Sequence, residues 1–433
     1  MHTFPTFKLL VSIPWGDKSD EISLALEDYP LFAFVSPEQM RKARAPVRIR
    51  LDARGGMHAL ADAPLRTPNG PPIFIHHFDA EGKFTGKTPL LFLDRRAMDR
   101  LFILDYAVDT NGSCYLLELI QSRQSGESNN RLQKIGSDGE VQWSRTGLTW
   151  SEEFDFHELS GSFKRLLTDG NSRLYLPATA HAGAIAEIDR YTGDVAHVYI
   201  SDKFGSEVFM NERGTVIYVL YFPDVNRRGL GFFNLAEQKV TSVVGEVALY
   251  GWLLYPFGVD ASADVYAWND SAVARISADG RIDVIAAFDN VVVRARDRVI
   301  FTSRLRLDDT RSPVVQVELY SPAGKTSYQE LLLPEELSAR HPKGWKLIHV
   351  DEQERYYVFG GEKPGQTGAL LVYSNDGRLE ETASTPRALL PVESTLEGYS
   401  YWDVDSRGRI YLPVTDAQGF KVIRLTTGLP LPG

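Results

Sequence analysis

The stretch YWDVDSRGRIYLPV, residues 401–414, consists of an apolar strand entry, an aspartate, a polar turn and an aromatic strand exit. With Asp405 as an anchor, Gly408 follows at position +3 and Tyr411 at position +6. This pattern predicts a β-hairpin, because Asp and Gly favour tight turns while aromatic residues favour strands. This hairpin pattern decides the fold because the chain repeats the pattern along its length.

The hairpin pattern recurs in one register at five more places. Their anchor, +3 and +6 residues are Asp52, Gly55 and His58; Asp109, Gly112 and Tyr115; Asp169, Ser172 and Tyr175; Asp260, Ala263 and Tyr266; and Asp351, Glu354 and Tyr357. Degenerate copies at 209–220 and 293–303 raise the count to eight units. Most copies precede a second turn, such as GSDGE (136–140) or SNDGR (374–378). Two hairpins per unit predict four antiparallel strands, repeated about every 40–50 residues, which is typical of a β-propeller.

We therefore expect an all-β chain in which residues 1–433 form a single β-propeller of four-stranded antiparallel blades, eight-bladed, with seven as the alternative. The last unit has no obvious fourth strand. A strand from the N-terminal segment 1–45, either 7–13 or part of 22–35, is expected to close the ring, because closure by both termini leaves no open sheet edge. Only 36–44 and 334–340 have helical character.

The composition excludes several classes of partner. A net charge of −10 argues against nucleic acid or an anionic membrane as the main partner, because both require concentrated Lys and Arg. Cys114 is the single cysteine, so no intramolecular disulfide and no Cys-x-x-Cys site can form. We find no signal peptide and no apolar run long enough for a transmembrane segment. These features predict a soluble, cytoplasmic protein, or an exported one if a leader has been removed.

The segment YPFGVDASADVYAWNDSAVARISADGRI (255–282) resembles the NHL-type propeller repeat, and 399–414 is a second, partial match. The resemblance implies a ring of blades. The superfamily includes binding scaffolds, lyases and calcium-dependent lactonases, so it leaves the function open.

The first strand of each propeller blade lines the central channel. Positions −1 and −3 from the anchors are mostly apolar and are expected to pack between blades, whereas position −2 lies on the opposite face. There the first unit and the last two carry Arg50, His349 and Asp403. If blade eight closes on blade one, these three side chains form a catalytic or anion-binding cluster. The alternative interpretation is an inter-blade ion pair that fastens the ring.

A second candidate is the acidic loop 148–162, in which Glu152, Glu153, Asp155 and His157 could bind calcium. The alternative is a solvated acidic loop, and no other cofactor is predicted. His76 and His77 are adjacent on one strand, so they should point to opposite faces and cannot bind one ion together.

The third candidate is a set of aromatic side chains that could bind a protein or glycan: Trp150, Trp252, Trp345 and Trp402. Half-buried structural tryptophans are the alternative. The sequence thus favours a non-enzymatic binding scaffold with its ligand at the channel mouth or rim loops. The alternative function is a metal-dependent lyase or lactonase-type hydrolase.

Overall fold

The computed structural model describes most of the repeated units. The described residues are 6–14, 47–61, 73–90, 99–122, 128–146, 166–178, 184–200, 208–222, 227–244, 255–268, 272–288, 290–294, 299–306, 313–321, 324–340, 345–351, 353–360, 367–386, 395–396, 401–415 and 419–426. These residues form eight antiparallel sheets, which we number 1 to 8 in chain order.

The repeated sequence pattern has one physical cause, which Asp405 illustrates. Its Oδ1 accepts hydrogen bonds from the backbone N–H groups of Arg407 and Arg409, both at 3.0 Å. Its Oδ2 accepts the Tyr411 hydroxyl at 3.1 Å. The aspartate therefore closes its own turn and ties it to the outgoing strand.

The same bonds recur at the other anchors. The hydroxyl of the +6 tyrosine donates to the anchor carboxylate at 3.0–3.5 Å in the copies that begin at Asp109, Asp169, Asp260 and Asp351. The residue at +3 has a positive φ, which suits glycine, but Ser172, Ala263 and Glu354 also adopt it, at 58°, 67° and 63°. The turn is thus determined more by the anchor than by the glycine.

Sheets 1 to 4 each follow the chain from the innermost to the outermost strand. Sheet 1 contains β2 (Val47–Leu51), β3 (Met57–Ala61), β4 (Ile73–Phe78) and β5 (Phe84–Leu90). Sheet 2 contains β6 (Asp99–Val108), β7 (Cys114–Ser122), β8 (Ser128–Ile135) and β9 (Val141–Thr146). Sheet 3 contains β10 (Leu167–Thr168), β11 (Leu174–Ala178), β12 (Ala184–Ile188) and β13 (Val195–Ile200). Sheet 4 contains β14 (Val208–Met210), β15 (Thr215–Phe222), β16 (Arg227–Asn234) and β17 (Lys239–Val244).

Sheets 5 to 7 have the same strand order. Sheet 5 contains β18 (Tyr255–Val259), β19 (Val265–Trp268), β20 (Ala272–Ile276) and β21 (Ile282–Ala287). Sheet 6 contains β22 (Asn290–Arg294), β23 (Val299–Arg306), β24 (Val314–Ser321) and β25 (Gly324–Leu332). The short helix α2 (Glu335–Arg340), where the sequence predicted one, leads to sheet 7, which contains β26 (Trp345–Val350), β27 (Tyr356–Gly360), β28 (Thr367–Tyr373) and β29 (Leu379–Pro386).

Sheet 8 combines the two ends of the described chain. It contains β30 (Thr395–Leu396), β31 (Asp403–Val404), β32 (Ile410–Thr415), β33 (Gly419–Thr426) and the N-terminal strand β1 (Thr6–Pro14). β1 pairs antiparallel with β33, from Thr6 opposite Thr426 to Pro14 opposite Gly419. The predicted pairing of segment 7–13 with the last unit is therefore confirmed. Segments 22–35 and 36–44 lie outside the described residues.

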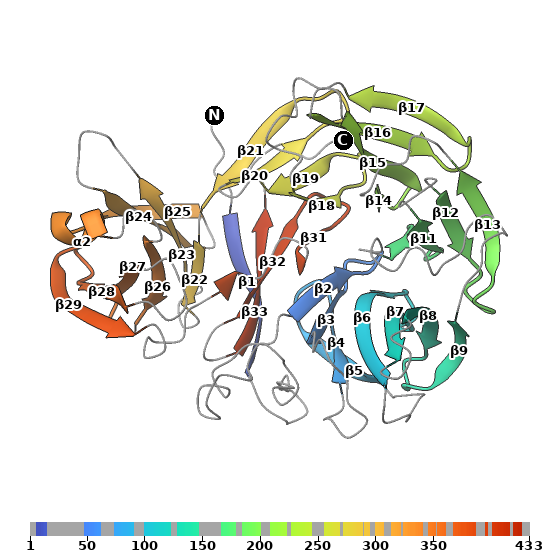
Figure 1. Ribbon diagram of the computed structural model, residues 1–433, viewed down its shortest axis with the longest axis horizontal. Helices are drawn as coiled ribbons and strands as arrows, with labels where there is room; N and C mark the ends of the chain where they lie inside the picture. The colour runs from blue at the N-terminus through green and yellow to red at the C-terminus, as the bar shows by residue number, and fades with distance from the viewer. Residues whose placement is uncertain are drawn as a thin grey trace.

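The first strands of sheets 1 to 5 and of sheet 8 surround one central cavity, while sheets 6 and 7 form a lobe beside it (Figure 1). Sheet 5 meets sheet 8 directly: the rings of Phe257 and Trp402 lie 5.1 Å apart, and the N–H of Ala261 donates to the carbonyl of Ser406 at 3.1 Å. Gly258 permits this approach, because a Cβ there would lie 2.6 Å from Val404. The four-stranded antiparallel sheets agree with a β-propeller architecture, but a single ring of eight blades is not confirmed.

The core lies between neighbouring sheets, as the pattern at positions −1 and −3 predicted. Ile49, Tyr106, Phe257 and Ile348, all at position −3, are buried. Trp402, also at −3, contacts both Phe257 and Trp268. Within the part of the chain that the structure describes, no helix has the length and apolar character needed to cross a membrane.

Candidate functional site

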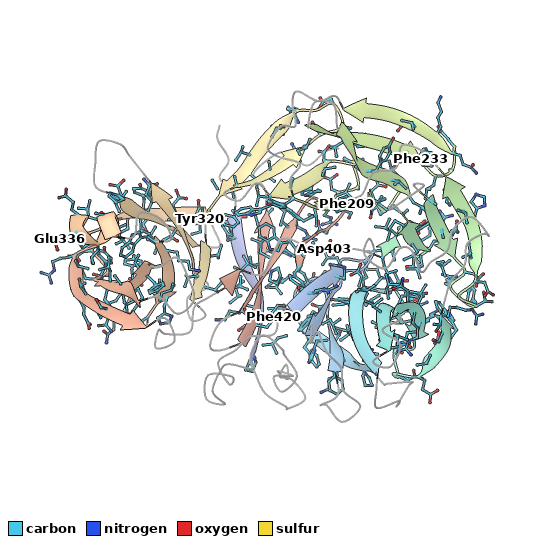
Figure 2. All side chains as sticks on the ribbon, viewed as in Figure 1. Phe209, Phe233, Tyr320, Glu336, Asp403 and Phe420 are labelled. Atoms are coloured by element: carbon cyan, nitrogen blue, oxygen red, sulfur yellow. The ribbon has the colours of Figure 1, made fainter. Side chains whose placement is uncertain are left out.

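The central cavity, of about 410 Å³, is the candidate functional site. Figure 2 labels two of the side chains at its wall, Asp403 from sheet 8 and Phe209 from sheet 4. Position −2 contributes one lining residue from each of the six surrounding sheets: Arg50, Ala107, Leu167, Phe209, Gly258 and Asp403. In these six sheets, position −2 of the repeated pattern therefore lies at the cavity wall.

Arg50 is held in place by a carboxylate that the sequence analysis did not identify. Its Nη2 lies 2.5 Å from Oδ1 of Asp105, a residue with no exposed surface. Oδ2 of Asp105 accepts the backbone N–H of Leu166 at 2.5 Å. Although burial opposes the charged form, Asp105 and Asp403 raise the pKa of Arg50 above its usual value. Arg50 therefore stays charged, and its ion pair ties sheets 1, 2 and 3 together.

The expected cluster of Arg50, His349 and Asp403 is only partly formed. Asp403 lies beside Arg50 at the cavity wall, and its Oδ2 accepts the backbone N–H of Leu51 at 3.0 Å. His349 lies on β26 of sheet 7, where its ring contacts Tyr357 at 5.4 Å, and it does not line the cavity. The prediction was wrong for His349, because sheet 8 contacts sheet 1 on one side but sheets 5 and 6 on the other. The Arg50 and Asp403 contacts support the alternative of polar fastening between sheets.

Two exposed arginines line the cavity on the side of sheets 1 and 8, where the exposed Glu81 also lies. Arg54 and Arg407 occupy the +2 position of neighbouring turns in sheets 1 and 8, and both line the cavity. Among the described residues, neither side chain has an ion-pair partner. The adjacent carboxylate of Asp405 does not neutralise Arg407, because it accepts bonds from its own turn and from Arg409, whose Nε lies 2.5 Å away. These two guanidinium groups are available to an anionic group.

The opposite side of the cavity is apolar with an acidic edge. Sheets 3 and 4 contribute Leu167, Phe209 and Met210, and the exposed Glu212 lies at the same wall. No Lys or Arg from sheets 3 to 5 lines the cavity in the described part of the chain. The described lining thus has its arginines on the side of sheets 1 and 8 and apolar side chains on the side of sheets 3 and 4, with carboxylates on both sides.

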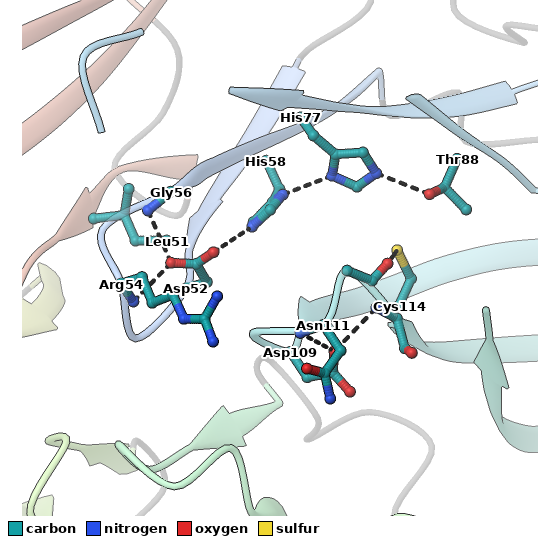
Figure 3. Close-up of polar contacts among 12 residues, drawn as sticks. Leu51, Asp52, Arg54, Gly56, His58, His77, Thr88, Asp109, Asn111 and Cys114 are labelled. Atoms are coloured by element: carbon teal, nitrogen blue, oxygen red, sulfur yellow. Dashed lines mark hydrogen bonds and ion pairs between the residues drawn. The ribbon is translucent and has the colours of Figure 1, made fainter. Parts of the chain in front are cut away.

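A chain of polar side chains leads from this cavity into sheet 1 (Figure 3). His58 takes the place of the usual +6 tyrosine, and its Nε2 lies 3.3 Å from Oδ2 of the anchor Asp52. The Nδ1 of His58 lies 2.7 Å from the Nδ1 of His77, whose Nε2 lies 2.8 Å from the Thr88 hydroxyl. Burial would raise the pKa of Asp52, but the hydrogen bond and the charge of His58 lower it below its usual value.

His76 and His77 point to opposite faces, as predicted. His77 pairs with His58, whereas the buried His76 lies beside the rings of Phe74 and Phe84. Burial and the neighbouring histidines lower the pKa of His77 to about 4.

The aromatic prediction requires a correction. Trp345 and Trp402 are 4% and 2% exposed, and both belong to hydrophobic cores, so they do not form a binding surface. Trp345 packs against Gly360, where a Cβ would lie 2.6 Å from its ring. Trp150 and Trp252, and the proposed calcium ligands Glu152, Glu153, Asp155 and His157, lie outside the described residues. Within the described ranges, no group of three or more His, Cys, Asp or Glu is placed to bind a metal.

Comparisons with known proteins add the following. No family model matches the chain, and no curated protein matches it. Among solved structures, it is similar to the Dos1 propeller, at 10% identity and a TM-score of 0.36 over 90% of this chain and 94% of that one. The β-propeller domain of the trilobed protease from Pyrococcus furiosus matches at 8% identity and a TM-score of 0.30, over 74% and 92% of the two chains. A prolyl endopeptidase structure matches at 11% identity and a TM-score of 0.36, over 89% of this chain and 57% of that one.

Proposed function

We propose that the protein is a non-enzymatic binding scaffold, a single NHL-like β-propeller domain over residues 1–433, which holds a small anionic ligand in its central cavity. The ligand's carboxylate or phosphate group binds between Arg54 and Arg407, and its apolar part contacts Phe209 and Met210. The observation that carries this proposal is the pair of exposed guanidinium groups at one side of the cavity, for which the described part of the chain offers no ion-pair partner.

The distribution of hydrogen bonds supports binding over catalysis. Oδ1 of Asp52 accepts the backbone N–H groups of Arg54 and Gly56, both at 2.8 Å, and its Oδ2 contacts His58. Oδ1 of Asp403 accepts the backbone N–H of Val404 at 2.9 Å, and its Oδ2 accepts that of Leu51. These carboxylates build turns and join sheets, so they are not free to act on a ligand. The exposed charged groups at the cavity are Arg54, Arg407 and Glu81 from sheets 1 and 8, and Glu212 from sheet 4. The two guanidinium groups suit an anionic ligand because guanidinium binds carboxylates and phosphates in a bidentate geometry.

The test is a titration of the full chain with citrate and with inorganic phosphate, followed by calorimetry and by the melting temperature. The wild type should bind at least one of the two anions. Replacing Arg54→Gln and Arg407→Gln should each weaken binding about tenfold or more, since a hydrogen bond to a charged group is worth roughly 1.5–3 kcal/mol.

Arg213→Gln is the matched control. Arg213 is an exposed arginine at the same +2 position in the turn of sheet 4, but it does not line the cavity. Its replacement should leave anion binding unchanged. The proposal fails if neither anion binds the wild type, or if all three variants weaken binding equally.

A further inference from the structure

We propose that Asp52, His58, His77 and Thr88 form a one-proton switch. Uptake of a single proton changes the charge at the cavity wall and converts the Thr88 hydroxyl from a hydrogen-bond donor to His77 into an acceptor from it. The proposal rests on the order of donors and acceptors along this chain of side chains (Figure 3).

The contact between the two histidines restricts the possible proton positions. The Nδ1 atoms of His58 and His77 lie 2.7 Å apart, so one hydrogen lies between them. Two hydrogens would clash, and two bare lone pairs would repel each other. The hydrogen belongs either to His77 or to His58, and each choice determines which of the other atoms among these four side chains donate and which accept.

In the first arrangement the hydrogen belongs to His77. The Nδ1–H of His77 donates to His58, and the Nε2–H of His58 donates to the Asp52 carboxylate. Nε2 of His77 is then bare and accepts the Thr88 hydroxyl at 2.8 Å. Both imidazoles are neutral, and the charge of Asp52 has no cationic partner within this chain of side chains.

In the second arrangement the hydrogen belongs to Nδ1 of His58. The ionised Asp52 can only accept, so His58 also keeps its Nε2–H and is an imidazolium. His77 accepts at Nδ1 and carries its hydrogen at Nε2, where it donates to Thr88 Oγ1. The Thr88 hydroxyl then turns to the backbone carbonyl of Ser137 in sheet 2, 3.5 Å away. This arrangement contains one more proton than the first.

The route of the proton follows from exposure. His58 is 5% exposed, whereas His77 is partly exposed, so the proton is exchanged with solvent through His77 while the charge appears on His58. His77 does not retain the charge, because burial and its neighbours oppose it. The other titratable groups nearby are His76 on β4, Tyr106 on β6, whose hydroxyl donates to the His58 carbonyl, and Asp109 and Cys114 of sheet 2.

The switch has a consequence at the cavity, which rests on the proposed function. Asp52 lines the cavity beside Arg54, so pairing it with an imidazolium removes one negative charge from the wall. Proton uptake should therefore strengthen binding of an anion, and by linkage an anion should promote proton uptake.

The test is a pH titration of the ligand-free protein by NMR of ¹⁵N-labelled histidine side chains, over about pH 5 to pH 8. As the pH rises, we expect this set of four side chains to lose one proton and His77 to change from the Nε2–H to the Nδ1–H tautomer at the same midpoint. The proposal is overturned if His77 keeps one tautomer throughout, or if the two changes have different midpoints. Since no ligand is present, this result does not depend on whether the cavity binds an anion.

Two variants sharpen the test. His58→Tyr restores the residue that five other copies of the pattern carry, so the fold should persist while the tautomer of His77 no longer changes with pH. His76→Gln alters the neighbouring histidine on the opposite face and should leave the two changes coupled. If the tautomer of His77 still changes with pH in His58→Tyr, the switch does not exist.

Discussion

The pair of carboxylates in the turn of sheet 5 gives a sharp prediction for stability. At position +4, where three other copies carry an arginine that contacts the anchor, this copy carries Asp264. Burial, followed by the charge of Asp260, raises the pKa of Asp264 to about 6, although Arg275 lies 3.6 Å away. Ionised Asp264 should therefore destabilise the folded state.

The sign and size follow from linkage. Asp264 has a raised pKa in the folded state, so between about pH 4 and pH 6 the folded state holds a proton that the unfolded state has lost, and stability falls as the pH rises. Above about pH 6, ionised Asp264 lowers the free energy of unfolding by its full amount, which is at most about 3 kcal/mol. Solvent reaches the carboxylate, whose side chain is 12% exposed, so we expect Asp264→Asn to stabilise the protein by about 1–2 kcal/mol at pH 7.5.

The assay is urea-induced unfolding of the wild type and Asp264→Asn at pH 7.5 and near pH 4. The difference should be largest at pH 7.5 and should vanish at the lower pH. Asp283→Asn is the control, because it removes the closer partner of Arg275, at 2.9 Å, and should destabilise. A variant that is less stable at pH 7.5, or a difference that does not depend on pH, would refute the reasoning.

Three further predictions concern a turn, a strand and a loop. Gly408 and Gly214 both have φ above +70°, so replacing either by alanine should lower the free energy of unfolding. Gly214→Ala should lower it by about 1–2 kcal/mol, because a Cβ there would meet open space. Gly408→Ala should lower it clearly more, because a Cβ there would lie 2.1 Å from the Tyr266 hydroxyl. Phe7→Ala on β1 should destabilise by about 3–5 kcal/mol in chemical unfolding, since Phe7 is 1% exposed, whereas the exposed Ser12→Ala should change little. The proposed calcium site at 152–157 predicts that calcium added after EDTA raises the melting temperature, by an amount that grows with its excess over the dissociation constant; no shift would exclude the site.

The sequence predicts the repeated turns well because each one is a local structure. The anchor Asp405 bonds to residues only two, four and six positions away, so the pattern can be read directly from the chain. The strand position that faces the cavity follows from the same register, and Arg50 and Asp403 were identified in this way.

The rest depends on contacts between distant segments. Asp105 bonds to partners 55 and 61 residues away along the chain. The one feature of the sequence that could have indicated its role was the presence of a charged residue inside an apolar strand. The pairing of His58 with His77 requires the register of β3 against β4, in which these two residues are direct partners. His349 was misplaced because sheets 6 and 7 do not line the cavity, so sheet 8 lies between sheets 5 and 1 there.

The arrangement of six sheets around one cavity can be tested by a disulfide between sheets 5 and 8. The backbones of Ala261 and Ser406 are joined by a hydrogen bond of 3.1 Å, and the single native cysteine, Cys114, is buried. Under mild oxidation the double variant Ala261→Cys and Ser406→Cys should form an intramolecular disulfide, detectable by mass spectrometry, with the native circular dichroism spectrum. A folded variant that forms no disulfide would contradict the account, because sheets 6 and 7 would then separate sheet 5 from sheet 8, as in a ring of eight blades.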